Sequence, residues 1–451
     1  MAAIDTVFKA YDVRGTVPDQ LDAELCHRIG AAFAAFAVRG DATVAEILVG
    51  RDMRPSGPDL VDAFATGVRS QGIDVIDLGL CSTDLVYFAS GSLDAPGAMF
   101  TASHNPAQYN GIKFCLRGAA PVGQDTGLTE IKELAGATLP VAELTGKRTE
   151  RDLLGAFADH VRSFIDTSGL RALKVVADTA NGMGGLVVPA VFDALPFELE
   201  VLYPELDGTF PNHPADPINP ANQVDLCKRV VDSGADLGLA FDGDADRVFV
   251  VDEQGVGLSG STTTAMVASS VLAKEPGATI LYNLICSKAV PEIIAEKGGT
   301  PVRTRVGHSF VKAVMAETGA AFGGEHSAHY YFRRNYRADS GLIASMFVLE
   351  LVATSGQPLS ELRKPFERYA DSGEINFEVA DPNQVIEQIG DAYAAADQDH
   401  LDGLTVDLGD WWFNVRPSNT EPLLRLNLEA ATREACDARV DELRALITKE
   451  T

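Results

Sequence analysis

The sequence predicts an α/β protein made of three related mixed α/β units and a smaller C-terminal α+β unit. Through the first 366 residues, short apolar runs of strand length alternate with segments whose apolar residues recur at helical spacing. Such alternation is typical of largely parallel sheets with crossover helices. Past Pro365 the pattern changes to one strand, a helix, two further strands and a final helix. At 451 residues the chain is also too long for a single core, which favours three or four domains.

The first unit is expected to span residues 1–150. Its helical patterns lie at Asp22–Arg39, Asp59–Gln71 and Leu128–Ala135, and its strand-like runs at Glu46–Gly50, Val75–Leu78 and Ala98–Thr101. Residues 140–150 are expected to be a connector without regular structure.

The same pattern recurs in residues 151–254 and 255–366, which suggests duplicated units although no close internal sequence repeat is present. The second unit has expected strands at Leu173–Ala177, Leu237–Phe241 and Val248–Val251. The third has expected helices at Thr262–Leu272 and Ala289–Lys297 and strands at Thr279–Asn283 and Arg303–Val306. The last unit, residues 367–451, has expected strands at Glu374–Val379, Thr405–Val415 and Leu423–Glu429, a helix at Pro382–Ala396 and an amphipathic final helix.

The charge balance restricts the partners of this chain. It carries 37 basic and 64 acidic residues, for a net charge of −27, which argues against binding to nucleic acid or to an anionic membrane. The N-terminal residues lack the features of a signal peptide, no apolar run has the length of a membrane span, and the six cysteines form no CxxC pair. We therefore expect a cytoplasmic protein with reduced thiols.

One stretch displays a serine on a tight turn. Thr101-Ala102-Ser103-His104-Asn105-Pro106 follows an apolar run, and Pro106 keeps Asn105 out of the helical region. Asn110-Gly111 predicts a second turn, after which Lys113 alternates with apolar neighbours and faces away from them. The stretch alone fits equally a nucleophilic serine beside a lysine and an ordinary polar hairpin.

A second stretch, Asp242-Gly243-Asp244-Ala245-Asp246-Arg247, places three carboxylates at alternate positions. Such carboxylates repel one another unless a cation lies among them, and Mg²⁺ prefers oxygen ligands of this kind. An EF-hand loop is the competing interpretation, because Glu253 falls at its twelfth position. Against it, Arg247 stands where an EF-hand requires glycine, and the flanking segments are predicted strands.

Two further polar loops are less specific by themselves. In Gly323-Gly324-Glu325-His326-Ser327-Ala328-His329, strand alternation would aim the side chains of Glu325, Ser327 and His329 in the same direction. A carboxylate, a hydroxyl and an imidazole suit the binding of sugar hydroxyls. Arg416-Pro417-Ser418-Asn419-Thr420-Glu421-Pro422 offers a guanidinium, hydroxyls and turn amides for a phosphate. By itself the first loop is unspecific, since polar loops of this kind are often only solvated, and the second stretch alone favours a turn with capping side chains.

Together, the four stretches resemble in order the phosphoserine, metal, sugar and phosphate-binding loops of the α-D-phosphohexomutase family, over essentially the whole chain. Tyr11-Asp12-Val13-Arg14-Gly15 and Val306-Gly307-His308 are weaker similarities to the same family. The resemblance implies four domains around a central cleft: residues 1–150 with the phosphoserine loop, 151–254 with the metal loop, 255–366 with the sugar loop and 367–451 with the phosphate loop.

The resemblance also implies an activity, the transfer of a phosphoryl group between O1 and O6 of a hexose through a phosphoserine enzyme and a hexose 1,6-bisphosphate. One Mg²⁺ per active site would be held by the phosphorylated Ser103 and by Asp242, Asp244 and Asp246. The other implied catalytic residues are Lys113, Arg247, Arg14 and His104. The implied substrate-binding residues are Tyr11, His308, Glu325, Ser327, His329, Arg416, Ser418, Asn419 and Thr420. Lys113 is a candidate base for the attacking hydroxyl, a role for which it must be neutral.

The preferred sugar stays open at this point. His326 favours a phosphomannomutase/phosphoglucomutase over a phosphoglucosamine mutase, in which we expect glutamine at that position. A catalytically silent phosphosugar-binding or partner protein would have lost the serine or a metal-loop aspartate, and neither is lost here. A phosphatase would leave the sugar and phosphate loops without a purpose. We expect phosphosugars as partners, and a monomer or weak homodimer.

Overall fold

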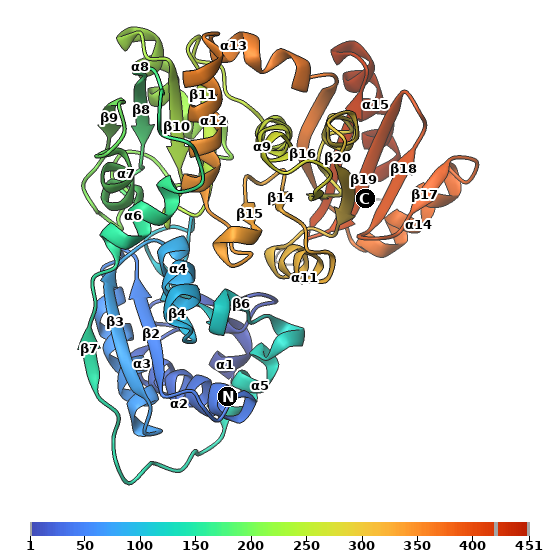
Figure 1. The fold of residues 1–451 in the computed structure, drawn as a ribbon. Helices are drawn as coiled ribbons and strands as arrows, with labels where there is room; N and C mark the ends of the chain where they lie inside the picture. Colours follow the sequence, from blue (N-terminus) through green and yellow to red (C-terminus); the bar gives the residue numbers. More distant parts are fainter. Residues whose placement is uncertain (1, 419–422, 449–451) are drawn as a thin grey trace.

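The computed structural model describes residues 2–418 and 423–448, and within them the chain forms four sheets that follow one another in sequence. We call the regions that carry these sheets domains 1 to 4. In Figure 1 the chain runs from domain 1 at the lower left through domain 2 at the upper left and domain 3 in the centre to domain 4 on the right. The predicted fold class, three related α/β domains and a smaller α+β domain, is confirmed by these sheets.

Domain 1 has a mixed sheet in the order β1-β5-β4-β2-β3-β7, in which β5 runs antiparallel to the other five strands. Its elements are α1 (Ala2–Val7), β1 (Val13–Thr16), α2 (Ala23–Gly40), β2 (Glu46–Arg51), α3 (Gly57–Ser70), β3 (Asp74–Leu80), α4 (Thr83–Leu93), β4 (Gly97–Phe100), β5 (Tyr109–Leu116), β6 (Ala120–Pro121), α5 (Leu128–Gly136) and β7 (Arg148–Glu150). Helices α2 and α3 pack backbone to backbone, since a Cβ at Gly67 would lie 2.0 Å from the carbonyl oxygen of His27.

Domain 2 has the strand order β11-β10-β8-β9, with only β11 antiparallel. Its elements are α6 (Leu154–Arg162), β8 (Lys174–Asp178), α7 (Gly184–Phe192), β9 (Glu198–Leu202), α8 (Val224–Ser233), β10 (Leu237–Phe241) and β11 (Val248–Asp252). Every residue of β10 and β11 is buried, which explains their unbroken apolar sequence.

Domain 3 has the strand order β13-β12-β14-β15, with only β15 antiparallel. Its elements are α9 (Gly260–Lys274), β12 (Thr279–Asn283), α10 (Ala289–Glu296), β13 (Thr300–Thr304), α11 (His308–Thr318), β14 (Phe322–Gly324), β15 (Tyr330–Phe332), α12 (Gly341–Ser355) and α13 (Leu359–Leu362). No single helix in the described part of the chain is long and apolar enough to cross a membrane; α12 and the segment Leu359–Phe366, which meet at a bend of 103°, reach that length and composition only as a pair.

The first three domains share one topology. The strand orders of the three domains are equivalent: β5-β4-β2-β3, β11-β10-β8-β9 and β15-β14-β12-β13. In each domain an antiparallel strand (β5, β11 or β15) pairs with the parallel strand that precedes it in the chain (β4, β10 or β14). The loop that joins these two strands carries the serine motif in domain 1, the aspartate motif in domain 2 and the glutamate motif in domain 3. The predicted duplication of units is therefore confirmed, and the three motifs occupy equivalent hairpins.

Domain 4 is an antiparallel sheet in the order β16-β20-β19-β18-β17. Its elements are β16 (Ala370–Glu378), α14 (Pro382–Ala392), β17 (Asp397–Asp399), β18 (Leu404–Asp407), β19 (Trp411–Pro417), β20 (Leu423–Ala430) and α15 (Arg433–Ile447). The prediction of one strand over Thr405–Val415 was wrong, because Gly409 at φ 87° turns the chain between β18 and β19.

Two other local predictions were wrong. Asn110-Gly111 is not a turn but lies inside β5, opposite β1. Its glycine is needed there for close packing, since a Cβ at Gly111 would lie 2.3 Å from the carbonyl oxygen of Val13. The expected connector at residues 140–150 ends in β7, which joins the sheet beside β3.

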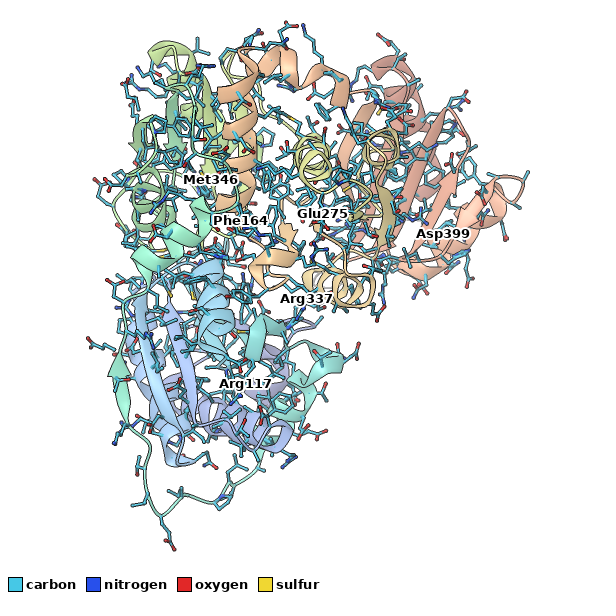
Figure 2. All side chains as sticks on the ribbon, in the orientation of Figure 1. Arg117, Phe164, Glu275, Arg337, Met346 and Asp399 are labelled. Atoms are coloured by element: carbon cyan, nitrogen blue, oxygen red, sulfur yellow. The ribbon has the colours of Figure 1, made fainter. Side chains whose placement is uncertain are left out.

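The core of domain 4 is separate from the rest. One apolar cluster runs from the α4 side of domain 1 through domains 2 and 3, and Figure 2 labels two of its members, Phe164 and Met346. The buried residues of domain 4 form their own cluster around Trp411 and Phe413. A domain with its own core and few apolar ties to its neighbours is expected to move as a unit.

Candidate functional site

Ser103 lies where domain 1 meets the aspartate loop of domain 2. Its Oγ donates a hydrogen bond to Oδ2 of Asp242 at 2.8 Å, and its backbone N–H donates to Oγ1 of Thr101 at 2.8 Å. The serine is held at φ 49°, a conformation that non-glycine residues adopt uncommonly. It is only 5% exposed, so the expectation of an exposed loop serine was wrong, because domain 2 packs over the turn.

Arg54 organises the turn that carries Ser103. This fully buried guanidinium donates to the carbonyl oxygens of Ser103 (2.9 Å), Asn105 (2.7 Å), Pro106 (2.8 Å) and Tyr109 (2.9 Å), and its Nε pairs with Asp52. Arg54 is not among the residues that were predicted from the sequence. Its one sequence signal is its place just past the carboxyl end of β2, the strand beside β4.

The three aspartates of the domain 2 loop form a compact, buried cluster. One carboxylate oxygen each of Asp242, Asp244 and Asp246 lies within 4.8 Å of the others. Oδ1 of Asp244 and Oδ1 of Asp246 are buried and have no hydrogen-bond partner among the described residues. Buried anionic oxygens without donors are costly, so this donor set fits a hard divalent cation.

Two helices support the loop from outside domain 2. The N–H of Thr83, the first residue of α4, donates to the carbonyl oxygen of Asp244 at 3.1 Å. The N–H of Gly341, the first residue of α12, donates to the carbonyl oxygen of Asp246 at 2.9 Å. The first N–H groups of a helix have no partner inside it, so both contacts pair groups that would otherwise be unsatisfied.

Lys113 lies against the aspartate cluster, as its place opposite the apolar face of β5 predicts. Its Nζ is 2.8 Å from Oδ2 of Asp244 and 2.8 Å from Oδ2 of Asp246. Burial lowers the pKa of Lys113, but the two carboxylates outweigh it and hold the pKa well above its usual value. The side chain is therefore an ammonium in this arrangement.

Arg247 joins the serine, an aspartate and a histidine. Its Nε donates to Oδ2 of Asp242 at 2.9 Å, and its Nη2 lies 3.4 Å from Oγ of Ser103 and 2.7 Å from Nδ1 of His104. Because a guanidinium only donates, Nδ1 of His104 accepts and the ring carries its proton on Nε2. Burial and the neighbouring Arg247 lower the pKa of His104 well below its usual value, which keeps the ring neutral.

Arg14 and Tyr11 approach the same region from the start of the chain. Nη1 of Arg14 donates to Oδ1 of Asn105 in the serine turn at 2.6 Å. The ring of Tyr11 packs edge-on to Phe310 at 6.3 Å, so it reaches from domain 1 to α11 of domain 3. His308 begins α11, but its side chain lies outside the described part of the structure.

The loop of domain 3 is a turn rather than a continued strand. Ala328 has φ 65°, and the N–H of Glu325 donates to the carbonyl oxygen of His329 at 3.0 Å. The strand alternation that predicted a shared direction for Glu325, Ser327 and His329 was therefore wrong. Glu325 is buried and points into domain 3, while Ser327 is half-buried in the turn.

Glu325 is held on both oxygens. Oε1 accepts from the hydroxyl of Tyr331, and Oε2 accepts from Nδ2 of Asn283 at 3.1 Å and from the N–H of Gly307 at 3.3 Å. This orientation leaves little freedom to the carboxylate.

His329 points toward the aspartate cluster. Its Nδ1 is 2.9 Å from Oδ2 of Asp339, and one ring nitrogen lies within 4.8 Å of a carboxylate oxygen of Asp246. Burial lowers the pKa of His329, but the bond to Asp339 outweighs it and raises the pKa. The other oxygen of Asp339 is 3.0 Å from Nζ of the buried Lys312, and sequence reasoning found neither of these two residues.

The arginine of the fourth motif is ordered by an acidic neighbour. Nη2 of Arg416 donates to Oε2 of Glu374 at 2.7 Å, and Nη1 of Arg425 lies 3.2 Å from the other oxygen of the same carboxylate. Arg416 and Arg425 are direct partners across β19 and β20. The N–H of Ser418 donates to the carbonyl oxygen of Leu423 at 2.8 Å, whereas Asn419 and Thr420 lie outside the described residues.

The four sheets and the serine–aspartate–arginine site define a four-domain enzyme that brings one hydroxyl, a cation site and several fixed positive charges together. In sequence, residues 5–138, 155–255 and 259–369 match alpha/beta/alpha domains I, II and III of phosphoglucomutase/phosphomannomutase, and residues 374–446 match the C-terminal domain of the same proteins. The chain belongs to the phosphoglucomutase/phosphomannomutase family, the α-D-phosphohexomutases, and is an isomerase of that class.

Relatives cover nearly all of the chain. It is 40% identical over 446 residues to the protein named phosphohexose mutases of Xanthomonas campestris pv. campestris, covering 98% of both chains. It is 39% identical over 437 residues to a phosphomannomutase of Escherichia coli K12, covering 94% of this chain and 95% of that one. A crystal structure of a phosphoglucomutase/phosphomannomutase family protein from Burkholderia thailandensis is similar with a TM-score of 0.90 and 33% identity, over 98% of this chain and 96% of that chain.

Proposed function

We propose that this chain interconverts hexose 1-phosphate and hexose 6-phosphate, with mannose and glucose phosphates as substrates, through a phosphoserine at Ser103 and a hexose 1,6-bisphosphate. The observation that carries the proposal is the 2.8 Å contact between Oγ of Ser103 and Asp242, inside a cluster of carboxylates with unpartnered oxygens. Transfer of a phosphoryl group to and from a hydroxyl depends on charge neutralisation, which a cation among these carboxylates would supply beside Ser103.

Asp242, Asp244, Asp246 and the phosphorylated Ser103 would hold one Mg²⁺. When bound, the cation supplies charge neutralisation to the phosphoryl group at Ser103. The proposed donor set fits, because Oδ1 of Asp244 and Oδ1 of Asp246 are buried without other partners in the described part of the chain.

The fixed cations of the site supply the remaining neutralisation. Arg247 reaches Oγ of Ser103 directly, and Lys113 lies across the aspartates as an ammonium. This geometry supports a charge-stabilising role for Lys113 rather than the role of a base. Arg14 and the neutral His104 orient the turn around the serine. Phosphoryl transfer depends chiefly on such positioning and charge compensation.

The sugar and its far phosphate would be bound by domains 3 and 4. Glu325 and Ser327 would bind the O3 and O4 hydroxyls, with Tyr11, His308 and His329 at the same ligand. The far phosphate would be held by Arg416, Ser418, Asn419 and Thr420. Because O3 and O4 are equatorial in both glucose and mannose, a ring turned end for end can present them again to the same groups. The separate core of domain 4 supports closure of that domain over the bound sugar.

Mass spectrometry and turnover of Ser103→Ala test the proposal. We expect the wild-type chain, after incubation with glucose 1,6-bisphosphate, to carry one phosphate on the peptide that contains Ser103. The variant should carry none and should lose mutase activity while its melting temperature stays close to that of the wild type. Full activity of the variant with bisphosphate present would refute the mechanism.

Side-by-side kcat/KM values for mannose, glucose and glucosamine 1-phosphates test the sugar. We expect mannose and glucose phosphates to be comparable and glucosamine phosphate to be poorer. The reverse order would identify a phosphoglucosamine mutase, and binding without turnover of any of the three would indicate a silent binding protein.

A further inference from the structure

Thr83 connects domain 1 to one of the aspartates of domain 2. It begins α4 and is fully buried, and no motif of the sequence includes it. Its Oγ1 donates to Oδ2 of Asp244 at 2.5 Å, and its N–H donates to the carbonyl oxygen of the same residue at 3.1 Å. Thr83 therefore donates hydrogen bonds to both the side chain and the main chain of Asp244.

The hydrogen bonds to the side chain of Asp244 reach only one of its two oxygens. Oδ2 of Asp244 receives both the hydroxyl of Thr83 and Nζ of Lys113, the latter at 2.8 Å. Oδ1 of the same carboxylate is buried and has no hydrogen-bond partner within the described residues. A carboxylate whose one oxygen is saturated by two donors can offer a cation only the other oxygen, so its rotation about the side chain is fixed before any metal arrives.

Asp246 offers a comparison inside the same loop. Its Oδ2 receives Lys113 at 2.8 Å, and its Oδ1 is likewise buried without a hydrogen-bond partner in the part of the chain that the structure describes. Lys113 thus orients both carboxylates from one side. Thr83 adds a second, uncharged donor to Asp244, and this donor comes from the domain that also carries Ser103.

We propose that Thr83 is a positioning residue that orients Asp244 for Mg²⁺ and thereby lets domain 1 set the metal affinity of the domain 2 loop. This inference rests on the proposed metal site. Hydrogen-bond partners behind a metal ligand typically change metal affinity by about 10- to 100-fold when they are removed. The hydroxyl of Thr83 does not touch the reacting atoms, so its effect is expected on metal binding rather than on the chemical step.

Mg²⁺ titration of the full, dephosphorylated chain by calorimetry measures this affinity directly. We expect Thr83→Val, which has the same shape without the hydroxyl, to bind Mg²⁺ about 10- to 100-fold more weakly than the wild type. Thr83→Ser, which keeps the hydroxyl, should bind within about threefold of the wild type. At saturating Mg²⁺, kcat of Thr83→Val should return to within a few-fold of the wild-type value.

A matched control is Thr405→Val in β18 of domain 4. Thr405 is also buried, and its hydroxyl accepts from Nδ2 of Asn414 at 3.1 Å, far along the chain from the metal loop. This variant should bind Mg²⁺ as the wild type does. If Thr83→Val does not fold, Thr83→Ala removes the same hydroxyl without added bulk, and the rise of its melting temperature on adding Mg²⁺ gives the same comparison.

The outcomes separate the inference from the function on which it rests. Wild-type affinity in Thr83→Val, or a Thr83→Ser variant as weak as Thr83→Val, would overturn the positioning role alone. A wild-type chain that takes up no Mg²⁺ would overturn the metal site, and the role of Thr83 with it.

Discussion

The guanidinium of Arg54 donates to the main-chain carbonyl oxygen of Ser103 at 2.9 Å. Three further carbonyl oxygens of the same turn accept from this guanidinium, and Asp52 neutralises it. The serine is thus presented to domain 2 by a buried cation that touches neither its hydroxyl nor the aspartate cluster. The strained φ of Ser103 persists because this network fixes the backbone on both sides of it.

Replacement of Arg54 should damage both stability and activity. Arg54→Met leaves Asp52 as an uncompensated buried charge, a change that costs about 3 to 5 kcal/mol of unfolding free energy. Arg54→Lys keeps the charge but cannot span four carbonyls, so we expect a smaller loss of stability and a large loss of kcat. Urea unfolding and steady-state kinetics measure the two effects. A lysine variant with wild-type kcat would show that the turn holds its shape without the forked donor.

Gly243 gives a second prediction, about the approach of domain 2 to the serine. A Cβ at this position would lie 2.4 Å from the carbonyl oxygen of Ser103. Gly243→Ala must therefore push the two loops apart, and we expect a loss of about 1 to 3 kcal/mol in stability together with a loss of kcat greater than tenfold. Gly155→Ala is the control, since a Cβ there meets nothing within 4 Å. Equal activity of both alanine variants would contradict the close contact.

The motifs in the three hairpin loops could be recognised from the sequence, but the residues that hold these loops in place through hydrogen bonds could not. Asp242 was selected because three carboxylates at alternate positions of one loop already favour a cation site, whereas Ser103 and Lys113 were preferred over an ordinary hairpin only through the resemblance of the four stretches to one family. Arg54 and Thr83 were missed because each stands alone in the sequence and gains its partners only when separate strands or domains pack together. Asn110-Gly111 misled for the related reason that its glycine serves packing between β5 and β1 rather than a turn.

The buried carboxyl of Asp84 is expected to make the free energy of unfolding depend on pH. This carboxyl is fully buried between domains 1 and 3, where it accepts from the hydroxyls of Ser82 and Ser340, and burial raises its pKa to about 7. Because the folded state holds the proton more tightly than the unfolded chain, the resulting stability is full below about pH 4 and is lost as the pH rises through 7.

The measurement is urea unfolding of the wild type and of Asp84→Asn between pH 5 and pH 8. The wild type should lose about 3 kcal/mol more than the variant over this range, since each unit of pKa shift corresponds to about 1.4 kcal/mol. Parallel curves for the two proteins would mean that Asp84 is ionised in the folded state at every pH tested.

Arg416 gives the last prediction, about the far phosphate. Its Nη2 is engaged by Glu374 at 2.7 Å, while its Nε is buried without a hydrogen-bond partner among the residues that the structure describes. A planar guanidinium can keep the glutamate on one side and bind a phosphate with its other donors, whereas a lysine presents a single point charge. We expect Arg416→Lys to raise KM for the hexose phosphate about tenfold or more, with kcat changed less and with a parallel loss of affinity for inorganic phosphate in calorimetry. Arg433→Lys, at an exposed position of α15, is the matched control and should leave both values unchanged. A lysine variant with wild-type KM and phosphate affinity would place the far phosphate away from Arg416.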